Sequence, residues 1–400
     1  EFRLFQTQYL TVFLIIMLAD WLQGTNMYTL YASYGVNIGN LFLTGFLSSA
    51  VFGTFLGIFV DRWGRRFGCL TFCVLEVIIN ILEHIPDMRL LLLGRILGGI
   101  TTSLLFSAFE SWMVSEHRKK GFPESLLTST FAMASWGNGL MAIGAGFLAQ
   151  VASDTRGDIG PFQVAIVLTL VCLILILFWE ENTGDHSDTG SADINGSASS
   201  ASEEHPSFVS SVRRSVKVIY ENPAILFLGL SQAFFEGAVF SFVFMWVPSL
   251  LSAGDGVLPT GLIFSCFMIS MTIGGIVFSL ALSYLPVDAE FLCVLVYIIS
   301  AASMLVPVFT FQFWPVFVSF IILECMLGMF NSCGAQLRSR YYPDNLQSSI
   351  MSVFRLPLNL LVVLGTKLSE RASLDVPALQ RVFGVVACMH MTALILQMLL

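Results

Sequence analysis

The sequence predicts an all-α membrane protein with twelve transmembrane helices arranged as two six-helix bundles. Of its 400 residues, 56% are hydrophobic and only 12% are charged, and the mean hydropathy is +0.80. A soluble fold could not hide this much apolar sequence, whereas one membrane-spanning helix uses roughly 20 mostly apolar residues. The apolar runs are long and do not alternate with polar residues, which favours helices over a closed barrel.

Apolar segments long enough to cross a bilayer follow one another along the chain. In order, the predicted spans are 9–31, 40–60, 67–85, 90–114, 126–150, 162–179, 223–251, 258–284, 290–311, 315–337, 346–367 and 378–400. The one long connection, 180–222, is rich in Ser, Gly and acidic residues and has little to bury, so we expect a disordered linker. The predicted N-terminal bundle is therefore 1–179 and the C-terminal bundle 223–400. The chain stops within an apolar run, so we expect the intact protein to be longer at both ends.

Basic residues in the connecting loops predict the side that each loop faces. With the N-terminus in the cytoplasm, twelve Lys and Arg residues fall in loops on that side and five on the other. Because positively charged loops are retained in the cytoplasm, we expect both ends and the linker to be cytoplasmic. The prediction is a monomeric multi-pass protein of the plasma membrane.

Residue patterns typical of enzymes and metal sites are missing from the sequence. The eight cysteines all fall in apolar segments and none forms a C-x-x-C pair, so we interpret them as small buried hydrophobes. No H-E-x-x-H, G-x-S-x-G or phosphate-binding loop occurs. We therefore expect no enzyme activity, no cofactor, no metal site and no nucleic-acid partner.

Two arginines, Arg95 and Arg355, lie inside predicted spans. A charge at mid-membrane costs about 2.5–3.5 kcal/mol on the insertion scale, so it needs a partner or a wet cavity. Polar residues recur at helical spacing along one face of each span that contains one of these arginines, and along one face of three other spans. The predicted substrate-binding residues are Arg355, Arg95, Asn359, Ser352, Gln23, Tyr31, Gln232 and Asn331. For Arg95, structural pairing with a neighbouring helix is the alternative.

Acidic side chains within the spans outnumber these arginines. The four candidates are Asp20, Glu110, Glu236 and Glu324. An unpaired carboxylate in a low-dielectric interior tends to take up a proton. We assign the four to proton coupling or to counterions of the arginines, with structural ion pairs as the alternative. Glu76 is not expected at the site, because its helix shows no other polar stripe.

The loop between the second and third spans carries a known motif. Gly57, Asp61, Arg62, Gly64, Arg65 and Arg66 match G-x-x-x-D-R-x-G-R-[RK], and the pattern resembles the signature of the major facilitator superfamily. The resemblance implies that this loop gates the conformational change and does not touch substrate. Gly94–Gly99 resembles the fourth-span R-x-x-x-G motif of the superfamily. It implies that spans one, four, seven and ten line a central cavity.

Other segments resemble the molybdate-anion transporter family over about residues 9–367. They are Ala19–Gln23, Leu104–Glu110, Gln232–Glu236, Phe244–Pro248, Ile263–Met268 and Phe354–Leu358. The resemblance implies a major facilitator fold and uptake of molybdate, a tetrahedral dianion, by alternating access. A guanidinium suits oxyanions, so Arg355 is the first choice of ligand and Arg95 the second. Glycine pairs such as Gly274-Gly275 suit helices that pack closely.

Two other functions stay open at this stage. Aromatic residues such as Trp21, Tyr28, Trp136 and Trp246 would suit a proton-coupled symporter of a sugar or another small organic solute. A membrane sensor would bind its ligand without moving it. Sulfate and tungstate are not distinguished from molybdate, because the three dianions share their shape and charge.

Overall fold

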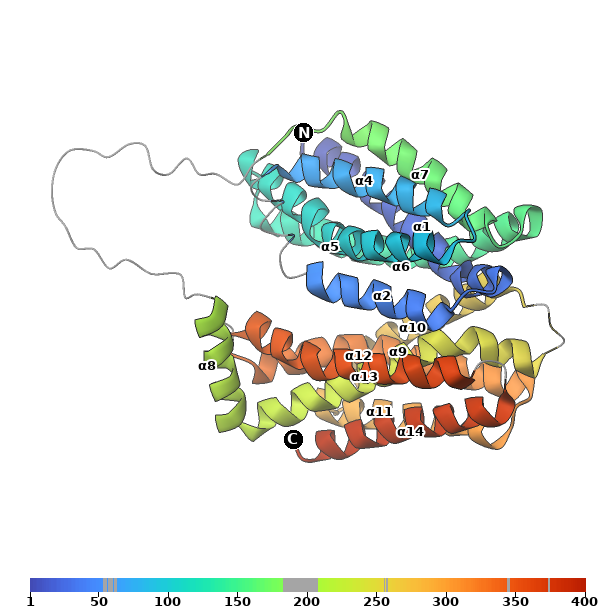
Figure 1. The fold of residues 1–400 in the computed structure, drawn as a ribbon. Helices are drawn as coiled ribbons and strands as arrows, with labels where there is room; N and C mark the ends of the chain where they lie inside the picture. The colour runs from blue at the N-terminus through green and yellow to red at the C-terminus, as the bar shows by residue number, and fades with distance from the viewer. Residues whose placement is uncertain are drawn as a thin grey trace, which may run out of the picture. The chain divides into compact units, whose positions relative to one another are not determined.

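The computed structural model describes residues 1–52, 56, 60, 63–182, 208–254, 256, 258–343, 346–372 and 375–400. Every regular element in these residues is an α-helix (Figure 1). Nine of the described helices are long and apolar enough to cross a membrane, and two shorter apolar helices accompany them. The fold class predicted from the sequence, an all-α multi-pass membrane protein, is confirmed.

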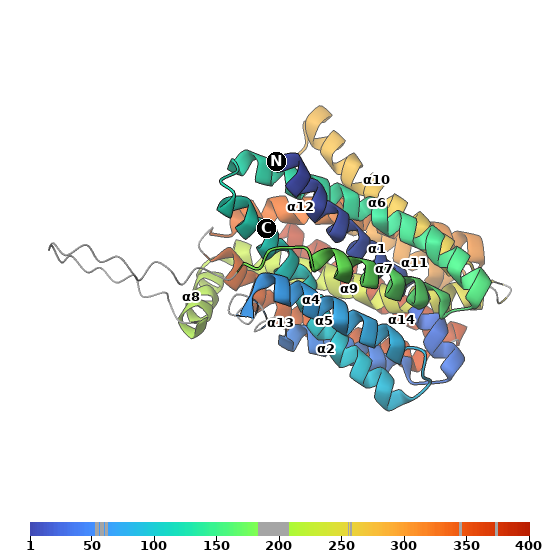
Figure 2. The same cartoon turned by 90° about the horizontal axis from the view of Figure 1, so that it is seen from above.

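The chain forms two compact units, Glu1–Ser199 with Pro259–Ser265, and Ser200–Leu258 with Cys266–Leu400. The helices of the first unit are α1 (Phe2–Tyr34), α2 (Ile38–Phe52), α4 (Arg65–Leu82), α5 (Met88–Lys119), α6 (Glu124–Arg156) and α7 (Gly160–Ile176). Helix α1 packs against α6 and α7, and α5 packs against both α2 and α4. Figure 2 shows α4 and α5 side by side, as does Figure 1.

Local sequence sets the ends of the first-unit helices. Asp87 begins α5 by accepting hydrogen bonds from the backbone N–H groups of Arg89 and Leu90, at 2.8 and 3.2 Å. Three basic residues in the last turn of α5 face the negative end of its dipole. Helix α1 ends at Gly35, whose φ of 65° lies in the left-handed region that glycine tolerates best.

The helices of the second unit are α8 (Phe208–Glu221), α9 (Pro223–Ala253), most of α10 (Thr260–Tyr284), α11 (Ala289–Phe309), α12 (Phe313–Tyr341), α13 (Gln347–Ala372) and α14 (Val376–Met398). Helix α9 contacts α12, α13 and α14, so it lies at the centre of the unit. Its Phe235 ring stacks on Phe330 of α12 with centroids 4.1 Å apart. This aromatic core holds α9 and α12 in fixed register beside the cavity described below.

Two details differ from the sequence prediction, and a third prediction falls on residues that are not described. Residues 208–221, assigned to the linker, form α8, because Ile219 is buried on one side of a strongly amphipathic segment. Residues 183–207 lie outside the described part of the chain, so the predicted bundle boundaries stay a prediction. Most of the cysteines are buried or partly buried as expected, but Cys266 and Cys388 are exposed.

Helices α10 and α12 approach each other at two glycines. A Cβ added to Gly274 would collide with the carbonyl oxygen of Cys325, and one added to Gly328 would collide with that of Met271. The neighbouring Gly275 has room, since the nearest atom would lie 3.9 Å from its Cβ. Backbone contact of this kind, permitted by small residues, is a common way to join membrane helices.

We expect Gly274→Ala to lower the thermal unfolding temperature of the purified protein, because the two backbones must separate to admit the methyl group. Gly275→Ala is the matched control, with the same chemical change one residue away, and should leave the temperature nearly unchanged. A fluorescence-monitored melt in detergent measures both. Equal unfolding temperatures for the two variants would contradict the close contact of α10 and α12.

Candidate functional site

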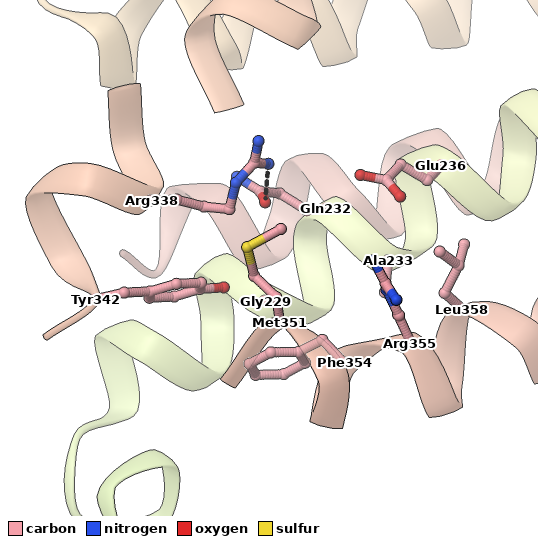
Figure 3. Close-up of a pocket in the computed structure, with 10 residues that line it drawn as sticks. All are labelled: Gly229, Gln232, Ala233, Glu236, Arg338, Tyr342, Met351, Phe354, Arg355 and Leu358. Carbon is pink, nitrogen blue, oxygen red and sulfur yellow. Dashed lines mark hydrogen bonds between the residues drawn. The ribbon is translucent and has the colours of Figure 1, made fainter. Parts of the chain in front are cut away.

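A cavity of about 160 Å³ lies within the second unit, between α9, α12 and α13 (Figure 3). Its walls are formed by Gly229, Gln232, Ala233, Glu236, Arg338, Tyr342, Met351, Phe354, Arg355 and Leu358. Pockets for drug-sized ligands measure about 300–1,000 Å³, so this cavity fits a smaller solute. Three residues selected from the sequence, Arg355, Gln232 and Glu236, line this cavity together, and the roles assigned to them stay predictions.

The two arginines of this cavity differ in how they are held. Arg338 Nη1 donates a hydrogen bond to Gln232 Oε1 at 2.9 Å, drawn as a dashed line in Figure 3. Gln232 Nε2 in turn donates to the carbonyl of Gly334 at 3.3 Å, which fixes the orientation of the amide. Arg355 is exposed and makes no hydrogen bond or ion pair with any residue that the structure describes.

The charged side chains that line this cavity are two guanidinium groups, of Arg338 and Arg355, and one carboxylate, of Glu236. Positive groups thus outnumber negative ones. Figure 3 shows Arg355 reaching from α13 toward α9, on the side of the cavity that also carries Glu236. A guanidinium presents several N–H donors in a plane and matches the oxygens of an oxyanion. Arg338 is not among the site residues predicted from the sequence, and it lies in the last turn of α12.

Close approach of α13 to α9 depends on Gly229. A Cβ at this position would collide with the Phe354 ring, so only glycine lets the ring lie against the α9 backbone. The ring of Phe354 also stacks against Tyr342, with centroids 6.5 Å apart and planes 12° from parallel. These contacts hold the α13 backbone next to Arg355 and so position its side chain.

A second cavity, of about 280 Å³, lies within the first unit between α1, α2, α4 and α5. The lining residues that carry polar or charged side chains are Asp20, Gln23, Ser49, Glu76, Arg95, Thr101 and Thr102. Gln23 Nε2 donates a hydrogen bond to Glu76 Oε2 at 2.9 Å, and Asp20 lies one turn of α1 away. Glu76 was not predicted to be a site residue, because its helix shows no other polar stripe. A carboxylate within a membrane span is nevertheless a candidate site residue even without such a stripe.

Arg95 is held by a buried ion pair beside this second cavity. Its Nη2 lies 2.7 Å from Glu83 Oε1, and the side chains of Arg95 and Glu83 are 13% and 1% exposed. Tyr31 donates its hydroxyl proton to the same carboxylate oxygen at 2.8 Å. The geometry favours the structural alternative for Arg95 and gives Tyr31 a structural contact too. Glu83 was overlooked because it falls at the predicted edge of its span.

Several predicted residues line neither cavity. They are Asn331, Ser352, Asn359, Glu110, Glu324 and Tyr31. Glu324 is buried, and its Oε2 atom has no hydrogen-bond partner within the described ranges. Asn331 and Glu110 are exposed. The roles assigned to this group from the sequence stay predictions. Among described residues, no group of three His, Cys, Asp or Glu side chains could hold a metal ion.

The predicted gating motif is described in part, since Gly57, Asp61 and Arg62 lie outside the described residues. Arg66 Nη2 donates to the carbonyl of Leu177 at 2.8 Å, at the end of α7. In return, the Glu181 carboxylate accepts hydrogen bonds from the backbone N–H groups of Arg66 and Phe67, at 2.9 and 3.0 Å. The start of α4 and the end of α7 therefore cap each other.

Gly64 and Arg65 complete the described part of this motif. Gly64 has a φ of 107°, and a Cβ there would collide with the Glu181 carboxylate. The backbone N–H of Arg65 donates to the carbonyl of Asn182 at 3.1 Å. The pairing explains why glycine is needed at this point of the motif. Glu181 itself was missed because it lies outside the pattern, more than a hundred residues along the chain.

The fold is that of a known class of membrane transporter. The solved nucleoside transporter NupG matches 99% of this chain and 98% of its own with a TM-score of 0.74, at 12% sequence identity. At this identity the likeness shows the fold alone, and that fold is the one of the major facilitator transporters.

Sequence comparisons give the family. A family model described as sugar transporters with 12 transmembrane segments matches residues 1–329. The molybdate-anion transporter of Takifugu rubripes is 32% identical over 384 residues, which cover 91% of this chain and 79% of the relative. The Xenopus laevis protein of the same name is 31% identical over 377 residues, with the same shares covered. The chain belongs to this family of major facilitator transporters, and the family predicted from the sequence is confirmed.

We expect Glu83→Gln to lower the thermal unfolding temperature sharply, because it leaves the Arg95 guanidinium buried without its counterion. Breaking a buried ion pair in this way costs about 3–5 kcal/mol in soluble proteins. The control is Glu290→Gln, which breaks the Arg340–Glu290 pair at 2.8 Å, where Arg340 is 65% exposed. An exposed pair contributes about 0–1 kcal/mol.

The double variant Glu83→Gln with Arg95→Gln separates the charge from the packing. It should be more stable than Glu83→Gln alone, since no unpaired charge is left between α1, α4 and α5. Melting temperatures of the three proteins in one detergent give the comparison. A double variant that is less stable than either single variant would contradict the ion-pair account of Arg95.

Proposed function

We propose that this protein takes up molybdate by alternating access and binds the anion in the Arg338–Arg355 cavity of the second unit. The observation that carries the proposal is Arg355, a cavity-lining guanidinium that makes no hydrogen bond or ion pair with the described residues. The name of the relatives, molybdate-anion transporter, supports the choice of anion. The proposal includes residence in the plasma membrane, a cytoplasmic linker and a monomeric state.

Binding of a tetrahedral dianion here follows from the donors that the cavity offers. Arg355 donates no hydrogen bond to the described residues, and Arg338 keeps the donors that Gln232 does not use. Charge-assisted hydrogen bonds to an oxyanion are roughly twice as strong as neutral ones. The small volume favours a compact ion, and the net positive charge favours an anion.

Glu236 determines when the cavity can accept the anion. An ionised carboxylate repels a dianion, so Glu236 serves as counterion to the arginines while the cavity is empty and is protonated when molybdate binds. This exchange couples one proton to one binding event. Asp20, Glu110 and Glu324 stay candidates for later steps of the same proton path.

A sugar or another small organic solute is the second candidate. The family model is described by sugar transport, and the cavity of the first unit is larger and includes the aromatic rings of Phe42 and Phe46. Molybdate uptake measured with an excess of sulfate or of sugars separates the two functions. The same vesicles distinguish a transporter from a sensor, because a sensor would bind molybdate without accumulating it inside.

We expect Arg355→Ala to reduce molybdate uptake into proteoliposomes by about 10- to 100-fold at limiting substrate, the loss that corresponds to one hydrogen-bonded charge. Arg355→Lys should retain part of the uptake, because the charge remains while the planar fork is lost. The matched control is Arg340→Ala, which removes an arginine of α12 that does not line the cavity. Unchanged uptake by Arg355→Ala would overturn the proposed site.

An inward proton gradient should raise molybdate accumulation by the native protein. In Glu236→Gln the side chain is permanently neutral, so we expect molybdate binding to persist while the gradient no longer drives accumulation. Glu124→Gln, which changes an exposed carboxylate paired with Arg118, is the control and should behave as the native protein does. Uptake that is independent of pH in the native protein and in Glu236→Gln would exclude this role of Glu236.

A further inference from the structure

Helix α8 is joined to a membrane-spanning helix by a single residue. It ends at Glu221, and α9 begins at Pro223. Asn222, between them, caps α9 by accepting a hydrogen bond from the backbone N–H of Ala224 at 3.1 Å. Figure 1 shows α8 lying across the end of α9 instead of continuing it, and α8 also packs against α13. Because α9 crosses the bilayer, α8 lies at the membrane surface.

One face of α8 is buried against the second unit. Ser215 and Ile219, one helical turn apart, are 0% and 7% exposed. The opposite face carries Arg213, Val216, Lys217 and Tyr220, whose spacing of three, four and seven residues places them together. Val216 is 50% exposed and Tyr220 is 90% exposed. The outward face thus combines two cations with an aliphatic and an aromatic side chain.

The cations of α8 make few ion pairs with the described residues of the protein. Within the described ranges, Arg213 and its neighbour Arg214 make no ion pair, and Lys217 lies 3.7 Å from the exposed Glu221. The basic residues at the end of α5 are different. Ion pairs join Arg118 to Glu124, Lys119 to Glu180 and Lys120 to Glu116. The charge on α8 is therefore available to an external partner of opposite sign.

We propose that this face of α8, with Arg214 at its edge, binds anionic lipid headgroups of the leaflet at this end of α9. A helix in the membrane interface places cations against lipid phosphates and sets aliphatic and aromatic side chains at the acyl boundary. All four residues of the face suit that environment. Its junction with α9 places α8 at the depth where headgroups lie.

The full chain, reconstituted in vesicles, tests the proposal by hydrogen exchange of the peptide that covers 208–221. Exchange should be slower in phosphatidylcholine vesicles containing about one-third phosphatidylserine than in pure phosphatidylcholine. The triple variant Arg213→Gln, Arg214→Gln and Lys217→Gln should lose this difference. Each cation removed should reduce the lipid-bound population roughly fivefold.

The matched control neutralises three cations that already have carboxylate partners, with Arg118→Gln, Lys119→Gln and Lys120→Gln. It should keep the phosphatidylserine effect on α8. Melting curves establish that each protein is folded. Equal hydrogen exchange of residues 208–221 in the two lipid compositions would then overturn the proposal. So would a loss of protection in Glu203→Gln with Glu204→Gln, because the acidic residues that precede α8 would then be the occupant of its basic face.

Discussion

The cost of holding a charge in the hydrocarbon core governs the arrangement of polar residues in this protein. A guanidinium or carboxylate within a span must find an opposite charge, a hydrogen-bonding network or a wet cavity. Arg95 meets the requirement through Glu83 and Tyr31, which leave it rigid. Arg355 meets it by lining a cavity, which leaves its donors open to a ligand. The same residue type thus forms a buried ion pair in one unit and lines a cavity in the other.

The two cavities differ in the sign of their charge. In the first unit, Asp20 and Glu76 face a cavity whose only arginine is already neutralised by Glu83. In the second unit, two arginines face the single carboxylate of Glu236. By their side-chain charges alone, the residues of the second cavity suit an anion better than those of the first.

Sequence reasoning found the fold because long apolar segments leave few alternatives in a chain of this composition. It also selected Arg355, Gln232 and Glu236, because a polar group within a span is conspicuous. The structure brings these three to one cavity, and their roles stay predictions. It missed Glu83, because that residue sits at a span edge where a charge normally costs little. Glu181 was missed because its partners depend on the tertiary arrangement of α4 and α7.

The short junction at Asn222 has a mechanical consequence. Asn222 caps the first turn of α9 with its side chain, and no further residue separates α8 from α9. A tilt of α9 would therefore move α8 along the bilayer surface. A leaflet that binds α8 tightly would oppose this movement, and a leaflet that binds it weakly would permit it. Lipid binding by α8, as proposed, would therefore act on the same helix that contributes Gln232 and Glu236 to the cavity.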